Sequence, residues 1–151
     1  MTAACRAPCC SSTPRLSASE LFSRGFRRNR EAPLPIEGAP IADAEGHSAA
    51  FSLALAGRTV ADIRFRATSC ATLIAYCEYL AETLAGLSLS LALAFSSQDL
   101  AAAVPGVPAQ KQARAILAVA AFRAALAAAS EIADPGERTD EGRLHLRHVA
   151  P

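Results

Sequence analysis

The fold is decided by residues 51–84, which read FSLALAGRTVADIRFRATSCATLIAYCEYLAETL. Apolar residues recur at every second position on both sides of Gly57: Phe51, Leu53, Leu55, Ala61, Ile63 and Phe65. This alternation around a Gly-Arg turn predicts an antiparallel hairpin with one buried face. After Cys70 the apolar spacing becomes helical, and we expect a helix over residues 71–84. Cys70 should therefore lie between the end of a strand and the start of a helix.

Helical spacing also occurs on either side of this segment. Ser17 and Glu20 have the spacing of a capping box, so a helix should begin near Ser17 and end before Pro33. Further helical stretches are expected at about residues 89–95, 98–103 and 109–129. The apolar face predicted for the last of these consists of Ala113, Ile116, Leu117, Ala120 and Ala124. With a third strand near residues 40–44, the predicted fold class is α+β: a small antiparallel sheet packed against several helices.

The two ends differ in composition from this body. Residues 1–18 are rich in Ser, Ala and Pro and predict a disordered leader, and residues 131–151 predict a flexible polar tail. A targeting peptide is the alternative for the leader, because it contains Arg and Ser and no acid before Glu20. Residues 19–130 are expected to form one domain, since the chain is 52% apolar and has 151 residues.

Composition narrows the class of function. A net charge of +1 argues against nucleic acid as a partner, and the apolar run at residues 84–95 is too short to span a membrane. The five cysteines are an odd number in two separate groups, which is a poor disulfide framework and favours a reducing, cytoplasmic setting. No catalytic triad pattern, phosphate loop or pair of catalytic acids is present, so we expect a protein that is not an enzyme.

The order of these elements resembles the NifU/IscU-type iron–sulfur cluster scaffolds over about residues 20–128. The segment LFSRGFRRNREAPL at residues 21–34 resembles the family's first helix, with Asn29 and Arg30 in step with its Asn-Pro-Arg turn. The other matching segments are VADIRF at 60–65, SCATLIA at 69–75, LAE at 80–82 with Gly86, LA at 117–118 and RAAL at 123–126. The resemblance implies a scaffold for iron–sulfur cluster assembly, with a cysteine desulfurase or another assembly protein as partner.

The resemblance also implies a metal site. The family holds a cluster, or an iron or zinc ion, with three cysteines, an aspartate and sometimes a histidine. Of its cysteines only Cys70 remains here, because the Cys-Gly-Asp motif falls on Glu45-Gly46-His47 and the His-Cys motif falls on Ala113-Arg114. The implied ligands are therefore Cys70, Glu45 and His47, a set suited to zinc or ferrous iron. The alternative is that Arg114 pairs with Cys70 or Glu45 and replaces the metal.

Each candidate also has a purely structural interpretation. Cys70 is then a small residue at a tight turn, and Glu45 and His47 are a solvated pair in a loop. Cys77 lies on the apolar stripe of its helix and is expected in the core. The arginines at 24, 27, 28 and 30 are either a surface for an acidic partner or an exposed helix end.

Three functions follow from these alternatives. The first is an iron–sulfur assembly scaffold that binds iron or zinc weakly. The second is a degenerate scaffold fold that acts as a protein-interaction module without a cluster. The third is a helical, Ala-rich domain whose resemblance is accidental.

Overall fold

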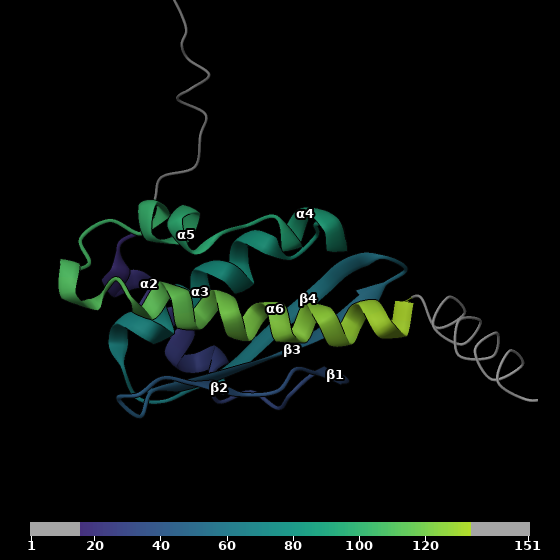
Figure 1. The fold of residues 1–151 in the computed structure, drawn as a ribbon, viewed down its shortest axis with the longest axis horizontal. Coiled ribbons are helices and arrows are strands. Elements are labelled where there is room, and N and C mark those ends of the chain that lie inside the picture. The colour runs from purple at the N-terminus through teal and green to yellow at the C-terminus, as the bar shows by residue number, and fades with distance from the viewer. Residues whose placement is uncertain (1–15, 134–151) are drawn as a thin grey trace, which may run out of the picture.

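The computed structural model describes residues 16–133 (Figure 1). The predicted leader and tail lie mostly outside this range, as do Cys5, Cys9, Cys10, His145 and His148. The strands are β1 (Ile36–Glu37), β2 (Ile41–Ala42), β3 (Ser48–Ala56) and β4 (Thr59–Ala67). The helices are α2 (Ala18–Arg28), α3 (Ala71–Leu84), α4 (Leu89–Leu93), α5 (Ser97–Ala103), the short 3-10 turn η2 (Ala109–Lys111) and α6 (Arg114–Ala133).

The predicted hairpin forms the centre of a small antiparallel sheet. Strands β3 and β4 pair so that Phe51 faces Phe65 and Leu53 faces Ile63, with the turn at Gly57 in the left-handed region at φ 66°. The short strands β1 and β2 both pair with the opposite edge of β3. The predicted third strand is therefore present as β2, and β1 is an addition that the sequence did not indicate.

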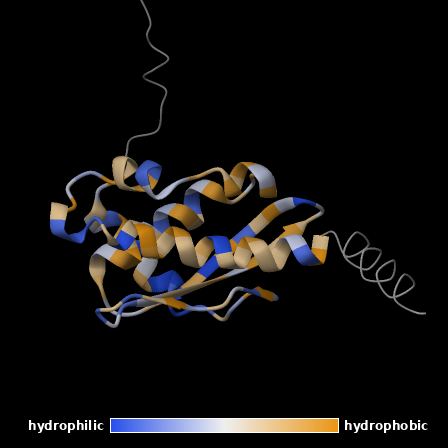
Figure 2. Ribbon diagram, viewed as in Figure 1, coloured by the Kyte–Doolittle hydropathy of each residue, from blue (hydrophilic) through white to orange (hydrophobic). Residues whose placement is uncertain are grey.

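Helices α3 and α6 cover one face of the sheet, and α2 packs against α3. The core lies between the sheet and these helices. At its centre, the centroid of the Phe51 ring lies 5.8 Å from that of Phe65 and 5.2 Å from that of Phe122 of α6. Figure 2 shows apolar residues along almost the whole of α6 and alternating along the hairpin. The α+β class predicted from residue spacing is confirmed.

Two features of the helices agree with their local sequence signals. Ser17 caps α2 in a capping box with Glu20, since the Glu20 amide donates to the Ser17 hydroxyl at 3.1 Å and the Ser17 amide donates to the Glu20 carboxylate at 3.0 Å. Helix α3 spans residues 71–84 with Cys70 at its N-cap, as predicted. Both signals are local, so they do not depend on the rest of the fold.

The prediction for α6 was wrong in its start and in its buried face. The helix begins at Arg114, after the separate turn η2, and it continues to Ala133, beyond the expected start of the tail at residue 131. Ile116, assigned to the buried face, is 63% exposed. Leu117 of the predicted face is buried as expected, but the buried side is centred on Phe122, the largest side chain of the helix, which packs on Phe51. The buried residues are Ala115, Leu117, Ala118, Val119, Ala121, Phe122, Ala125, Leu126 and Ala129.

Helix α6 also belongs to a segment that could span a membrane by its length and composition. Among the described residues, the segment Ala109–Ala133 is long and apolar enough to cross a bilayer by length and composition. Half of its most apolar window is buried within the fold. A helix that forms the core of a domain needs this composition, so the segment is weak evidence for a membrane span.

Candidate functional site

The candidate site is built around the turn that joins β2 to β3. Asp43 organises this turn, because its Oδ1 accepts hydrogen bonds from the amides of Glu45 and His47, each at 2.9 Å. The Asp43 amide in turn donates to the His47 carbonyl at 2.9 Å. Gly46 has φ of 93°, a left-handed conformation that favours glycine. The turn therefore holds residues 43, 45 and 47 in a fixed relation.

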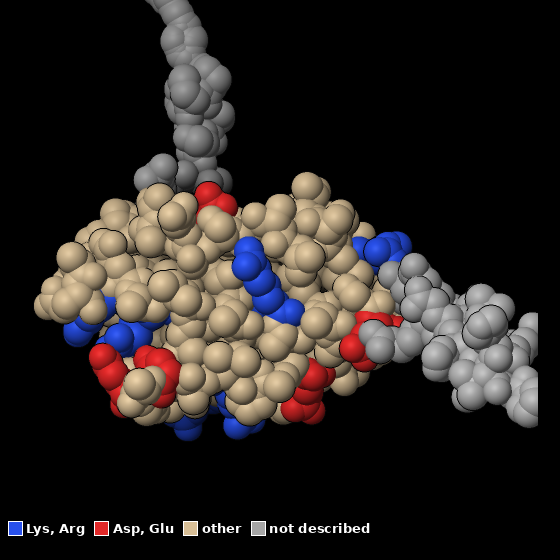
Figure 3. Space-filling model, viewed as in Figure 1, with Lys and Arg blue, Asp and Glu red and all other residues tan. Residues whose placement is uncertain are grey.

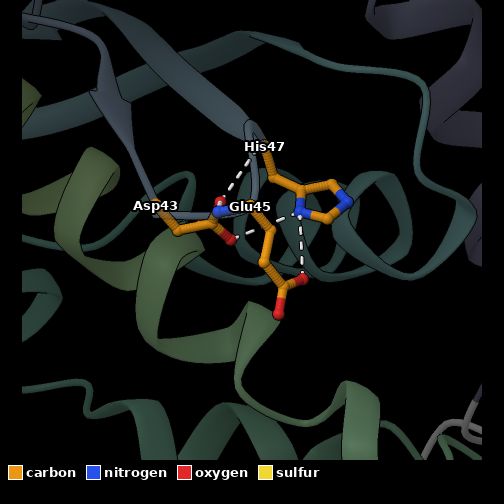
Figure 4. A group of neighbouring side chains, drawn as sticks. All are labelled: Asp43, Glu45 and His47. Atoms are coloured by element: carbon orange, nitrogen blue, oxygen red, sulfur yellow. Dashed lines mark hydrogen bonds and ion pairs between the residues drawn. The ribbon is translucent and has the colours of Figure 1, made fainter.

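Their side chains converge on one another (Figure 4). The His47 Nδ1 lies 3.3 Å from Asp43 Oδ2 and 3.8 Å from Glu45 Oε1. One ligand-type atom from each of the three residues lies within 4.8 Å of the others. Two carboxylates and an imidazole are ligands that zinc and ferrous iron accept. The structure thus brings together the predicted pair of Glu45 and His47 and adds Asp43 to it.

Asp43 stays ionised in this setting. Desolvation acts to raise its pKa, but hydrogen bonds from the amides of His47 and Glu45, together with the His47 ring, hold that pKa below its ordinary value. Asp43 was absent from the predicted ligand set, although the spacing Asp43-x-Glu45-x-His47 would have indicated it. Asp43 lies outside residues 45–47, the three positions onto which the family's Cys-Gly-Asp motif falls.

Cys70 lies between β4 and α3 as a half-buried free thiol. It occupies the N-cap of α3, with φ of −129° and no hydrogen bond from its side chain to the helix amides. Cys77, by contrast, is fully buried, and burial raises the pKa of its thiol above the ordinary range, so it is a core residue as predicted.

Arg114, the first residue of α6, connects Cys70 to the turn. Its Nη2 lies 3.2 Å from Glu45 Oε1, and its guanidinium lies beside the Cys70 side chain. The Cys70 side chain raises the pKa of Arg114, and so does the charge of Glu45, while desolvation acts in the opposite direction. Arg114 also has a buried Nε without a hydrogen-bond partner among the described residues. The positive charge thus sits in contact with two of the three predicted ligands.

The three predicted ligands, Cys70, Glu45 and His47, therefore do not all lie together. Glu45 and His47 adjoin each other, whereas Cys70 is not in the close group of ligand atoms and is joined to Glu45 through Arg114. Acidic and basic side chains accordingly lie next to one another at the end of the molecule that carries the β2–β3 turn (Figure 3). A hollow of about 400 Å³ opens beside them, lined by apolar side chains as well as by charged ones: Ile41, Ile116, Leu117, Ala120, Asp43, Glu45 and Arg114.

The strand that leads to Cys70 is held by Asn29. The Asn29 Oδ1 accepts from the Ala67 amide at 2.8 Å, and its Nδ2 donates to the Ala67 carbonyl at 3.1 Å. One side chain thus satisfies both backbone groups at the end of β4, three residues before Cys70. This is the residue that the sequence placed in step with the family's Asn-Pro-Arg turn.

Asn29→Ala should lower the free energy of unfolding by about 1–3 kcal/mol, because it leaves two partly buried backbone groups without partners. We also expect the rate of alkylation of Cys70 by iodoacetamide to change severalfold, counted by mass spectrometry on the peptide that contains it. Ser23→Ala is the matched control, since Ser23 is exposed on the same helix. If the two variants have equal free energies of unfolding and equal rates of Cys70 alkylation, Asn29 does not position the loop before Cys70.

Comparison with known proteins identifies the family of this chain. Residues 25–133 match the family model of the NifU-like N-terminal domain. The chain belongs to the NifU-like N-terminal domain family. This match covers α3, α6 and the site between them, so the resemblance seen in the order of sequence motifs is confirmed.

Solved structures are similar to this chain at low sequence identity. One is described as an iron–sulfur cluster assembly scaffold protein for the SUF system, from Fervidobacterium islandicum; it is 13% identical over 72% of this chain and 95% of its own, with a TM-score of 0.53. Another, a nitrogen-fixing NifU-like protein (N-terminal) from Brucella abortus, is 16% identical over 72% of this chain and 80% of its own, with a TM-score of 0.43. No curated protein matches the chain. At 13% identity the NifU-like chain shares a fold with the SUF-system protein, and its function has to be argued from its own residues.

Proposed function

We propose that this NifU-like chain acts in iron–sulfur cluster assembly as a scaffold-type protein that binds a single ferrous or zinc ion weakly. The proposal is supported by the family match and by the fold shared with the SUF scaffold. The ligands proposed are Cys70, Glu45 and His47, with Asp43 beside them. The family's usual partner, a cysteine desulfurase, is the partner we propose, and the cytoplasm is the compartment in which the thiol of Cys70 would stay reduced.

The donor set fits a single ion better than a cluster. Iron–sulfur clusters are held mainly by cysteine thiolates, and the described part of the site offers one, Cys70. The other donors are the carboxylates and the imidazole of the β2–β3 turn. These suit zinc and ferrous iron, for which mixed sulfur, nitrogen and oxygen ligands are common.

The observation that carries this function is the group of ligand atoms from Asp43, Glu45 and His47, which lie within 4.8 Å of one another. The strength of metal binding is limited by Arg114, which lies beside both Cys70 and Glu45. A metal ion that binds these two residues must displace the guanidinium, because two positive charges at this distance repel each other. Binding should therefore be weak and should compete with the internal ion pair. The same contact favours the second candidate function, a protein-interaction module that holds no metal, because Arg114 already neutralises the ligands.

Arg114→Ala should strengthen zinc binding by about tenfold, since it removes a positive charge from the site. Cys70→Ser should abolish stoichiometric zinc uptake, and Arg114→Cys should increase it and develop colour after anaerobic reconstitution with iron and sulfide. Zinc content and visible spectra of purified protein measure all three. Cys77→Ala is the control, because that thiol is buried in the core.

The outcomes separate the two functions. Zinc uptake that Cys70→Ser leaves unchanged would rule out the proposed site. If the parent protein, Arg114→Ala and Arg114→Cys all bind no metal while a cysteine desulfurase still binds the chain, the interaction module is the function. Arg114→Ala should cost little stability in either case, because the Glu45 side chain is 67% exposed and becomes solvated when its partner is lost.

A further inference from the structure

A second hollow, away from the Arg114 ion pair, flanks Cys70 on its α2 side. This hollow, of about 260 Å³, is lined by Phe22 and Phe26 of α2, by Ile74 of α3, and by Ser69 and Ala71. The last two residues are the immediate neighbours of Cys70 in the chain. Anything that fills this aromatic hollow therefore lies beside the thiol.

The hollow stays open because α2 uses a different stripe to pack on α3. Leu21 and Gly25 face α3, and a Cβ on Gly25 would lie only 2.7 Å from the Ile74 Cγ2. Phe22 and Phe26 follow on the adjoining stripe, with ring centroids 6.0 Å apart and Phe26 48% exposed. Two phenyl rings at the edge of a hollow can bury a further apolar side chain, and exposed aromatic residues of this kind are typical of binding surfaces.

The charge at the edge of this hollow is positive. Arg30 lies over the Phe26 ring at 5.7 Å from its centroid, and Arg27 follows Phe26 in the helix. Within residues 16–133, neither has a carboxylate partner, whereas Arg24 pairs with Glu82 at 2.8 Å and Arg28 pairs with Glu78 at 2.7 Å.

The nearby acids are engaged elsewhere. Glu20 closes the capping box at the start of α2, and Glu31 lies 3.5 Å from the Nε of Arg64 on the sheet. The four arginines noted in the sequence thus separate into two that hold α2 to α3 and two, Arg27 and Arg30, that remain available to an anionic partner.

We propose that this hollow is a docking site for an acidic segment of a partner protein. The segment would place one apolar side chain in the hollow, against Phe22 and Phe26, and its carboxylates against Arg27 and Arg30. Apolar walls with a cationic edge are complementary to such a segment in both shape and charge. Docking itself does not require the proposed metal site. The inference rests on the proposed function only for its consequence, which is that a docked segment would cover the Cys70 thiol on this side.

The test uses two short synthetic peptides, one with a central leucine between glutamates and one in which lysines replace the glutamates. The glutamate peptide should shift the amide resonances of Phe22, Phe26, Ser69 and Ala71 in nitrogen-15 spectra of the full chain, and the shifts should weaken as salt is added. It should also slow alkylation of Cys70 by iodoacetamide severalfold, measured on the Cys70 peptide by mass spectrometry. The lysine peptide should do neither.

Matched variants locate the binding. Phe26→Ser and Arg30→Glu should each weaken binding of the glutamate peptide by about tenfold. Leu91→Ser and Arg123→Glu should leave it unchanged, because these exposed residues lie on α4 and α6. Cys70→Ser should still bind the peptide although it loses zinc uptake, so the docking site and the proposed metal site can fail separately.

Three results would overturn the docking site. The first is equal binding of the two peptides. The second is an equal loss in Leu91→Ser and Phe26→Ser. The third is binding of a single-stranded oligonucleotide that Phe26→Ser does not weaken, which would show that the arginines act as a general anion surface without the hollow.

Discussion

Gly38→Ala should lower the free energy of unfolding by about 3 kcal/mol, near the upper end for overpacking a filled core. A Cβ at this position would lie 2.5 Å from the backbone nitrogen of Ala125 and 2.6 Å from its Cα. These are backbone atoms in the middle of α6, so no side-chain rotation can relieve the clash. The segment between β1 and β2 would have to move away from the helix. Urea unfolding of the two proteins measures the difference.

Gly57→Ala is the control for this prediction. Its Cβ would meet nothing within 4 Å, and only its left-handed φ of 66° is unfavourable for alanine. We expect a loss of about 1 kcal/mol at this turn. A loss at Gly38 no larger than that at Gly57 would contradict the close approach of this segment to α6.

Arg28→Ala should cost about 3 kcal/mol at pH 8, because it leaves the carboxylate of Glu78 buried without its cation. Glu78 is 1% exposed, and its two oxygens lie 2.7 Å from Arg28 Nε and 3.2 Å from Nη2. A third guanidinium nitrogen, Nη1, donates to the Ile63 carbonyl at 2.9 Å. One side chain thus joins α2 to both α3 and β4. Thermal or urea unfolding at several pH values measures the loss.

The loss should be smaller at pH 5. Burial raises the pKa of Glu78 from 4.5 to about 7, and a hydrogen bond with Glu82 acts in the same direction, although the bond to Arg28 opposes it. Since the pKa is higher in the folded protein, the contribution of this group to stability is fully present below pH 4.5 and is lost as the pH rises through about 7. A protonated Glu78 needs no cation, so Arg28→Ala is tolerated better in acid.

Two variants check this interpretation. Glu78→Gln should remove the decline in stability between these pH values. Arg24→Ala should cost less than about 1 kcal/mol at either pH, because the side chain of Arg24 is 49% exposed in its pair with Glu82. A loss in Arg28→Ala that does not change with pH would show that Glu78 stays ionised throughout.

The candidate site was only partly visible in the sequence. Cys70, Glu45 and His47 could be named because a strand-to-helix junction and the family motif mark their positions. Asp43 was missed because it lies outside the family motif at residues 45–47, and its hydrogen bonds to the amides of Glu45 and His47 form only in the folded turn. The contact of Arg114 with Cys70 was foreseen only as one of two alternatives, since the two residues meet through the packing of α6 beside α3.

What the sequence by itself determined were the elements whose signals are local. The alternation around Gly57, the capping box at Ser17 and the change of period at Cys70 each involve residues close in the chain, and all three appear in the structure. Tertiary structure alone decided the short strand β1, which is two residues long and has no periodicity to detect. It also decided the rotation of α6. That helix is apolar almost all round, so its spacing marks no face, and only the fit of Phe122 against Phe51 determines which side is buried.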